Sequence, residues 1–123
     1  MLKKAAASFL SAQNDFETEL YDRAISSLYY SAFQTIVALM LLRGESVSKH
    51  THVRSFVNKE LKLPGHIPIE LSNMYNVLMG MRADADYNAE IFFTRDEVGH
   101  LITQVEEFNR IVRKLIENES KIT

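Results

Sequence analysis

The sequence contains no cysteine among its 123 residues. This absence excludes a disulfide scaffold, thiol catalysis and thiolate metal sites, and it suits a reducing compartment. Glycine and proline are also scarce, with four and two residues. Together with 46% hydrophobic and 24% charged residues, this composition predicts a helix-rich globular chain rather than a disordered one. At this length, residues 1–123 are expected to form a single domain.

An excess of basic charge is missing as well, since the formal net charge is −2 and the pI is about 6.1. Broad binding to nucleic acid normally requires a basic surface, so this mode of binding is excluded. Lys49, Arg54 and Lys59 cluster in one segment and could still hold a few phosphates. The N-terminal segment MLKKAAASFL has a basic pair but no long apolar stretch after it. We therefore expect no signal peptide and a cytoplasmic protein.

The most apolar part of the chain is the run from Ala24 to Leu42, which has nineteen residues and no charge. About twenty apolar residues suffice to cross a bilayer, so a membrane span is one interpretation. However, Ser26, Ser27 and Ser31 lie in this run with Gln34 and Thr35, and each would cost roughly 1 kcal/mol or more in hydrocarbon. The run therefore predicts the central helix of a bundle, with no membrane contact.

Two apolar seams run along this predicted helix at steps of three and four residues. The first seam consists of Ala24, Leu28, Ser31, Thr35, Leu39 and Leu42. The second consists of Ile25, Tyr29, Phe33, Ile36 and Met40. A chain this short has few helices with which to cover both seams. The second seam is therefore predicted to form the interface of a homodimer.

Apolar spacing and helix-end signals predict the other helices. Thr94 and Glu97 form a capping-box pattern before the last helix. Ser48 is the predicted N-cap of a short third helix, and Pro68 is the predicted first residue of the fourth. The segment YNAEIFF is predicted to be a packed loop. The fold class is therefore all-α, an up-and-down bundle of about five helices, with the other four predicted at residues 2–19, 49–61 and 69–86 and along Val98–Ile116.

The densest polar cluster is MRADADYN at residues 81–88. One interpretation is a simple ion pair, because Arg82 and Asp86 are four residues apart on a helix. The other is a ligand site, in which arginine binds phosphate and Tyr87 stacks on a base. Neither a cofactor nor a metal is expected. His50 and His52, two residues apart, point in nearly opposite directions on a helix.

Four sequence features together resemble the HEPN superfamily, specifically its small stand-alone prokaryotic proteins. They are RAISSLYYSAF (Arg23–Phe33), Gly44 after the apolar run, SKHTHVRSF (Ser48–Phe56) and MRADADY (Met81–Tyr87). The resemblance implies an up-and-down helical bundle, usually a dimer. It also implies pairing with a minimal nucleotidyltransferase in a toxin–antitoxin-like system. By the same analogy, that partner attaches a nucleotide to a tyrosine beside the last motif, which here is Tyr87.

Some proteins that this chain resembles cleave RNA, using an arginine followed four to six residues later by a histidine. Here Arg82 matches the arginine, but Tyr87 stands where a histidine five positions on would be. A phenol with an ordinary pKa near 10 moves protons poorly at neutral pH, whereas imidazole does so well. Binding of a nucleotide or RNA needs no proton transfer, so it remains possible without the histidine.

Three hypotheses follow from these features. The first is a non-catalytic protein that binds a nucleotide or RNA and works with a nucleotidyltransferase, through Arg82, Asp86, Tyr87, Lys49 and His50. The second is a ribonuclease toxin with an atypical site that recruits His50 from another helix. The third is a structural helical adaptor in which the polar cluster is only an ion pair. If Arg82 and Asp86 form an exposed ion pair, Arg82→Ala is expected to lower the free energy of unfolding by less than about 1 kcal/mol.

Overall fold

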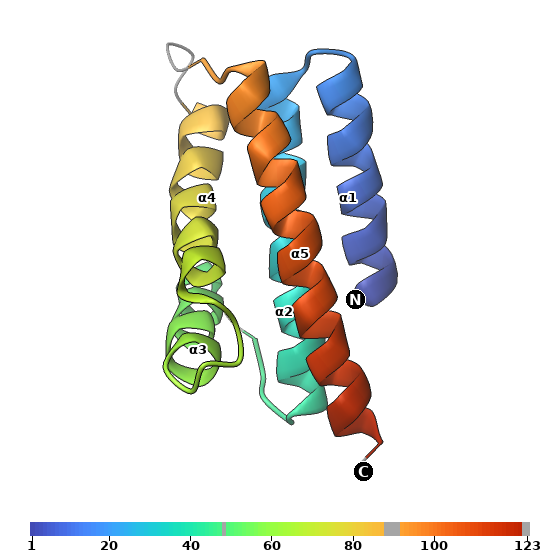
Figure 1. Ribbon diagram of the computed structural model, residues 1–123, viewed down its shortest axis with the longest axis vertical. Coiled ribbons are helices and arrows are strands. Elements are labelled where there is room, and N and C mark those ends of the chain that lie inside the picture. Colours follow the sequence, from blue (N-terminus) through green and yellow to red (C-terminus); the bar gives the residue numbers. More distant parts are fainter. Residues whose placement is uncertain (48, 88–91, 122–123) are drawn as a thin grey trace.

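The computed structural model describes residues 1–47, 49–87 and 92–121. Within these ranges the chain is helical and contains no strand, which confirms the all-α prediction (Figure 1). The elements are α1 (Leu2–Glu17), α2 (Tyr21–Leu42), α3 (His50–Phe56), the π-helical segment η1 (Val57–Lys62), α4 (Ile69–Tyr87) and α5 (Arg95–Ser120).

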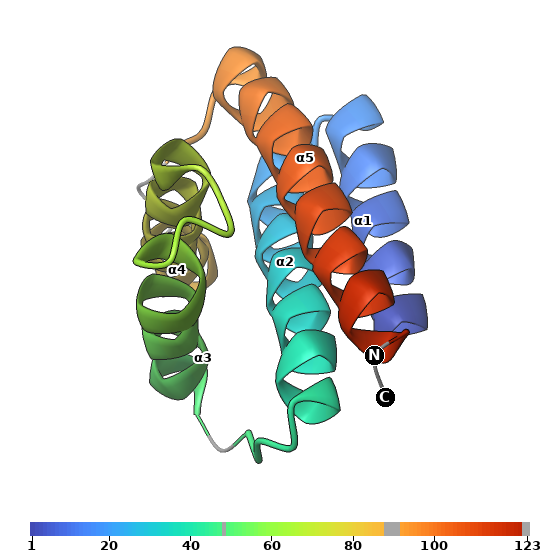
Figure 2. The same ribbon diagram turned by 60° about the horizontal axis from the view of Figure 1, so that its bottom comes forward.

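Helix α2 is the centre of the bundle, as the uncharged run predicts. Helices α1, α4 and α5 all pack along it, and Figure 1 shows α5 crossing in front of α2 with α1 and α4 on either side. In Figure 2, α3 and α4 lie together on the other side of α2 from α1. The first predicted seam is fully buried except at its end, where Leu42 is 36% exposed because the helix ends there.

The second seam of α2 fills the interior of a single chain, which corrects the predicted dimer interface. Ile25, Tyr29, Ile36 and Met40 have no exposed surface, and only Phe33 is partly exposed. The physical reason is that α4 covers this side of α2, with the ring of Tyr75 5.9 Å from that of Tyr29. The four fully buried residues therefore have no surface with which to contact a second copy. The dimer itself stays a prediction.

By length and composition, α2 is the one helix in the described part of the chain that could cross a membrane. Its most apolar window is 56% buried inside the bundle, as in the core helix of a globular protein. Its polar residues also have partners inside the chain. The buried Ser31 hydroxyl donates to the carbonyl of Ala5 at 2.7 Å and accepts from Asn109 Nδ2 at 3.0 Å. This Ser31 junction joins α1, α2 and α5.

Several predicted helix ends move by one to three residues. Helix α1 ends at Glu17 and α2 begins at Tyr21, because Glu19 between them adopts a positive φ of 62°. The capping residue Thr94 accepts a hydrogen bond from the Glu97 amide, which confirms the predicted start of α5. The Glu97 carboxylate accepts from the hydroxyl of Thr94, not from its amide. Pro68 lies just before α4, where its carbonyl accepts from the amides of Leu71 and Ser72.

The third predicted helix, residues 49–61, is two elements, α3 followed by η1. Its predicted N-cap, Ser48, lies outside the described residues, and Lys49 is the N-cap of α3. The predicted packed loop lies in part outside the described residues, which omit 88–91. At its end, Phe92 is 86% exposed whereas Phe93 is buried. Of the described residues in this segment, Phe93 packs as predicted, whereas Tyr87 and Phe92 do not.

Gly80 lies in the middle of α4, and a Cβ atom added there would meet no heavy atom within 4 Å. A helical glycine costs roughly 0.5–1 kcal/mol relative to alanine. Gly80→Ala is therefore expected to raise the free energy of unfolding by about this amount, measured by urea unfolding followed by circular dichroism. Gly44→Ala is the control, and it should lose stability because Gly44 has a φ of +80°. A loss in Gly80→Ala as well would contradict the prediction.

Candidate functional site

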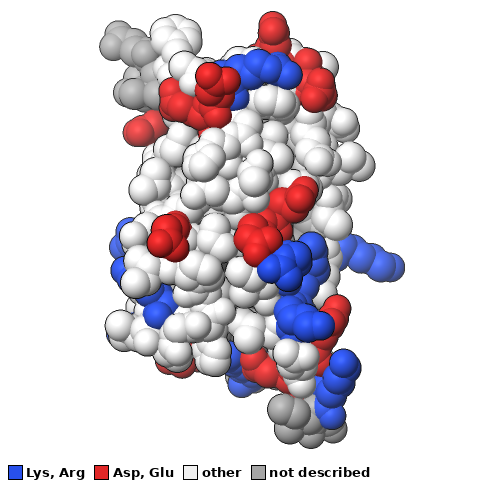
Figure 3. All heavy atoms as spheres, viewed as in Figure 1, with Lys and Arg blue, Asp and Glu red and all other residues white. Residues whose placement is uncertain are grey.

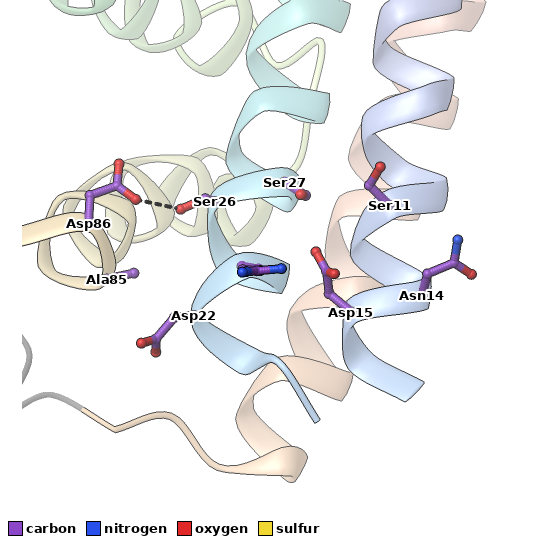
Figure 4. A pocket seen from close by; sticks show the side chains of 9 residues that line it. Ser11, Asn14, Asp15, Asp22, Ser26, Ser27, Ala85 and Asp86 are labelled. Atoms are coloured by element: carbon purple, nitrogen blue, oxygen red, sulfur yellow. Dashed lines mark hydrogen bonds between the residues drawn. The ribbon is translucent and has the colours of Figure 1, made fainter. Parts of the chain in front are cut away.

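Arg82 on α4 is held in place from two sides. Its Nη1 atom lies 3.2 Å from Asp86 Oδ2, as the spacing of four residues predicts. Asp86 Oδ1 in turn accepts from the hydroxyl of Ser26 on α2 at 2.8 Å (Figure 4). The side chains of Arg82 and Asp86 are only 16% and 32% exposed. The pair is therefore a link between α4 and α2 in which Asp86 stays exposed and Arg82 is more covered than the sequence suggests.

The guanidinium of Arg82 also lies over two aromatic rings of α2. Its central carbon is 5.2 Å from the ring centre of Tyr29 and 5.8 Å from that of Tyr30, within the range of cation–π attraction. The Nε atom is buried without a hydrogen-bond partner. No hydrogen bond from the described residues reaches Nη2, and this atom is not among the buried ones. Within the described residues, the two N–H groups of Arg82 Nη2 therefore have no hydrogen-bond partner.

His50, the first residue of α3, also contacts the rings of Tyr29 and Tyr30. Its Nδ1 atom is 2.7 Å from the Tyr29 hydroxyl, and its ring stacks on Phe33 with centres 4.5 Å apart at 22°. Burial, and then the positive charge of Arg82, lower the pKa of His50 below its ordinary 6.5. The imidazole is therefore neutral at neutral pH. We call Arg82, Tyr29, Tyr30, Phe33 and His50 the Arg82 site.

The predicted site residues are only partly brought together. Arg82, Asp86 and His50 meet, although they come from α4 and α3. Lys49 is exposed beside His50, and none of its contacts with described residues involves the site. Tyr87 ends α4 with 84% of its surface exposed, so it does not pack against Arg82. The sequence analysis placed Phe33 in a dimer seam.

A groove of about 710 Å³ includes Asp86, the carboxylate partner of Arg82, and Figure 4 shows its lining side chains from close by. The other charged residues of the groove are Asp15, Asp22 and Arg23, so it carries more negative than positive charge. A phosphate in the groove would be repelled. The favourable side of Arg82 for an anion is therefore the one that faces Tyr30 and His50.

The face shown in Figure 3 has no broad basic region. Acidic and basic side chains lie together at its upper end and again from mid-height to the lower end, with a largely uncharged zone between them. In the described part of the chain, no group of three or more histidine, aspartate or glutamate side chains is arranged to hold a metal ion. Any anion binding must therefore depend on a few placed donors rather than on a general field.

Comparison with known proteins agrees with this helical arrangement. A family model described as "HEPN domain" matches residues 1–115. A protein of Methanocaldococcus jannaschii named "Putative toxin" is 31% identical over 102 residues, which are 83% of this chain and 69% of its own. A protein of Thermotoga maritima named "UPF0332 protein" is 32% identical over 102 residues, 83% of this chain and 77% of its own. The family match covers all the helices that build the Arg82 site, and the chain therefore belongs to the HEPN domain family.

Proposed function

We propose that this HEPN protein binds a nucleotide or single-stranded RNA at the Arg82 site without cleaving it. One observation carries the proposal: Arg82 is fixed by Asp86 and two tyrosine rings, yet none of the described residues bonds to its Nη2 atom. A guanidinium that is already positioned loses little entropy when it binds a phosphate. The neighbouring half-buried Tyr30 and Phe33 offer aromatic surface to a base.

The absence of cleavage is proposed from the chemistry of the motif. Tyr87 occupies the position at which a histidine would move the proton, and 84% of its surface is exposed. Binding of a phosphate requires only donors and charge, and these are present. The relative named as a toxin supports a place in a toxin–antitoxin-like pair. We propose a minimal nucleotidyltransferase as the second member of that pair.

Arg82→Ala tests the binding function. We expect the affinity for a short labelled single-stranded RNA to fall about 10- to 100-fold in fluorescence anisotropy, because a charge-assisted hydrogen bond is lost. Because Arg82 packs on two rings, we expect a stability loss of about 1–2 kcal/mol, more than the sequence suggests. Arg110→Ala is the matched control, since it removes an exposed arginine paired with Glu107 on α5. Equal affinity in the folded Arg82 variant and the wild type would end the proposal.

A second candidate function, RNA cleavage, is favoured by one observation. His50 lies in the Arg82 site, where the atypical ribonuclease hypothesis requires an imidazole. Purified wild-type protein and single-stranded RNA decide between the two functions. Cleavage that disappears in both Arg82→Lys and His50→Gln would favour the ribonuclease. Intact RNA together with measurable binding is the result we expect.

Tyr87 tests the proposed partner. Its side chain is 84% exposed at the end of α4, so another protein could reach its hydroxyl. After co-expression with a neighbouring minimal nucleotidyltransferase, intact-mass measurement is expected to show a nucleotide adduct. The adduct should be absent in Tyr87→Phe and retained in Tyr21→Phe. An adduct that persists in Tyr87→Phe would place the modification elsewhere.

We further propose that the protein is a homodimer in the cytoplasm. The family resemblance and the absence of cysteine support this proposal, while the interface residues predicted from α2 are buried in one chain. Light scattering measures the oligomeric state. A monodisperse particle of 14.1 kDa at micromolar concentration would contradict the dimer.

A further inference from the structure

Within the Arg82 site, the hydroxyl of the fully buried Tyr29 lies against the ring of the partly exposed His50. Tyr29 is fully buried, and burial is the main cause that raises the pKa of its hydroxyl above 10.0. The phenol therefore keeps its proton at neutral pH and must direct it to an acceptor. Of the described residues, His50 Nδ1 at 2.7 Å is the acceptor within hydrogen-bond geometry of this hydroxyl, and the hydroxyl of Tyr75 lies close enough to lower the pKa of Tyr29.

A neutral imidazole carries one proton, on one of its two nitrogens. If Nδ1 accepts from Tyr29, that proton lies on Nε2. No hydrogen bond with the described residues uses Nε2. The buried polar atoms without a partner in the same part of the chain are Tyr75 Oη, Arg82 Nε and Asn109 Oδ1. Nε2 is not one of them, so solvent reaches it.

Two free donors therefore flank the same pair of rings. The Arg82 guanidinium and the His50 ring lie 5.8 and 6.1 Å from the ring centre of Tyr30, and 5.2 and 5.7 Å from that of Tyr29. One donor is charged and the other is neutral. Both come from helices that lie together on one side of α2 (Figure 2), and no hydrogen bond with the described residues uses either donor.

We infer that Tyr29 positions His50 as a neutral imidazole protonated on Nε2, and that His50 Nε2 and Arg82 Nη2 together bind a phosphodiester. This inference rests on the proposed function and deepens it, because it names a second donor and the residue that orients it. It also bears on the choice between binding and cleavage. A protonated Nε2 can donate to a phosphate oxygen, but it cannot take a proton from a ribose hydroxyl.

The groups around His50 make its titration easy to interpret. Tyr29 and Tyr30 face it from α2, and Arg82 faces it from α4. Arg54 on its own helix acts on the Tyr29 hydroxyl. Tyrosine and arginine keep one charge state between about pH 5 and 8. A change in the charge of these groups within that interval therefore reports the protonation of His50. Protonation of His50 adds a positive charge, and binding of a phosphodiester should strengthen as the pH falls through its lowered pKa.

Nitrogen-15 NMR of the histidine rings tests the positioning step without any ligand. We expect the Nε2-protonated tautomer to dominate for His50 in the wild type, and this preference to weaken in Tyr29→Phe. Tyr21→Phe is the control, because it removes a tyrosine hydroxyl that accepts from Arg95 on α5. A dominant Nδ1-protonated form in the wild type, or an unchanged tautomer in Tyr29→Phe, overturns the positioning step.

Two substitutions of His50 test the binding step with a short labelled single-stranded RNA. Glutamine places an amide N–H near the position of Nε2, whereas asparagine places it near Nδ1. We expect His50→Asn to bind about three- to tenfold more weakly than wild type, the effect of one lost hydrogen bond, and His50→Gln to recover part of the loss. His100→Gln, on the exposed surface of α5, is the control and should bind as wild type does.

The outcomes separate the inference from the proposed function. If wild type binds the RNA and His50→Asn binds equally well, the two-donor site is wrong while the proposed function stands. If wild type binds no RNA but His50 has the Nε2-protonated form, the proposed function and the two-donor site both fail and the role of Tyr29 stands.

Discussion

Replacing Asn109 with aspartate is expected to lower the free energy of unfolding by about 3–5 kcal/mol at neutral pH. Asn109 is 2% exposed, and its Nδ2 atom donates to Ser31 in the junction of α1, α2 and α5. A carboxylate at this place cannot donate, and no cation is recorded beside Asn109 among the described residues. Its oxygens would also face the oxygen of Ser31. Since domains are stable by only about 5–15 kcal/mol, the loss is a large share of the total.

The pH dependence of this variant identifies the cause. Burial raises the pKa of the introduced carboxyl in the folded state, so the loss is complete above that raised pKa. It should shrink as the pH falls toward about 3.9, the ordinary value for aspartate. Urea unfolding at several pH values measures this, with Asn109→Ala as the uncharged control. If the aspartate and alanine variants lose the same stability at neutral pH, the explanation by buried charge is wrong.

Phe108→Ala is expected to cost about 3–5 kcal/mol, because it leaves a cavity in the centre of the core. Phe108 is fully buried on α5 and stacks on Tyr75 with ring centres 5.7 Å apart at 17°. Tyr75 in turn lies against Tyr29, with ring centres 5.9 Å apart. The aromatic contact thus continues from α5 through α4 to the α2 tyrosine that contacts His50.

The same substitution should therefore disturb the Arg82 site from a distance. We expect Phe108→Ala to bind RNA more weakly even at temperatures at which the variant is still folded, because Tyr29 loses the packing of Tyr75 against it. Phe108→Leu is the matched control, since it keeps most of the volume and should lose clearly less stability. Calorimetry and anisotropy measure the two effects. A variant that loses less than about 1 kcal/mol would contradict the tight packing described here.

Much of the fold could be predicted because local signals and burial agree. The uncharged run of α2 predicts a core helix, and the Thr94 cap predicts the start of α5. The second seam of α2 was misjudged for a physical reason. The apolar side chains of α4, such as Tyr75 and Leu78, can cover either α2 or another copy, and the sequence does not state which.

The Arg82 site was only half predictable. The pair of Arg82 with Asp86 follows from helical spacing, because both residues lie on one helix. The approach of His50 depends on how α3 packs against α2, a contact between residues 21 positions apart in the sequence. The burial of Arg82 likewise depends on Tyr29 and Tyr30, which patterns within α4 cannot reveal. Tertiary packing, rather than local propensity, builds this site.

The π-helical segment η1 bears on how the chain tolerates changes in length. Just after it, the amide of Leu63 bonds to the carbonyl of Asn58, five residues back, and such a turn holds one residue more than an α-helical turn. Asn58 faces α4, where its side chain pairs with Asn76 and Ser72. Deleting one residue from Val57–Lys62 should therefore restore a regular α-helix. The hydrogen bond between the side chains of Asn58 and Asn76 would then be lost. A one-residue deletion inside α2 would instead rotate all following core side chains by about 100° about the helix axis. Natural members of this family that differ in length should therefore differ in η1 and not in α2.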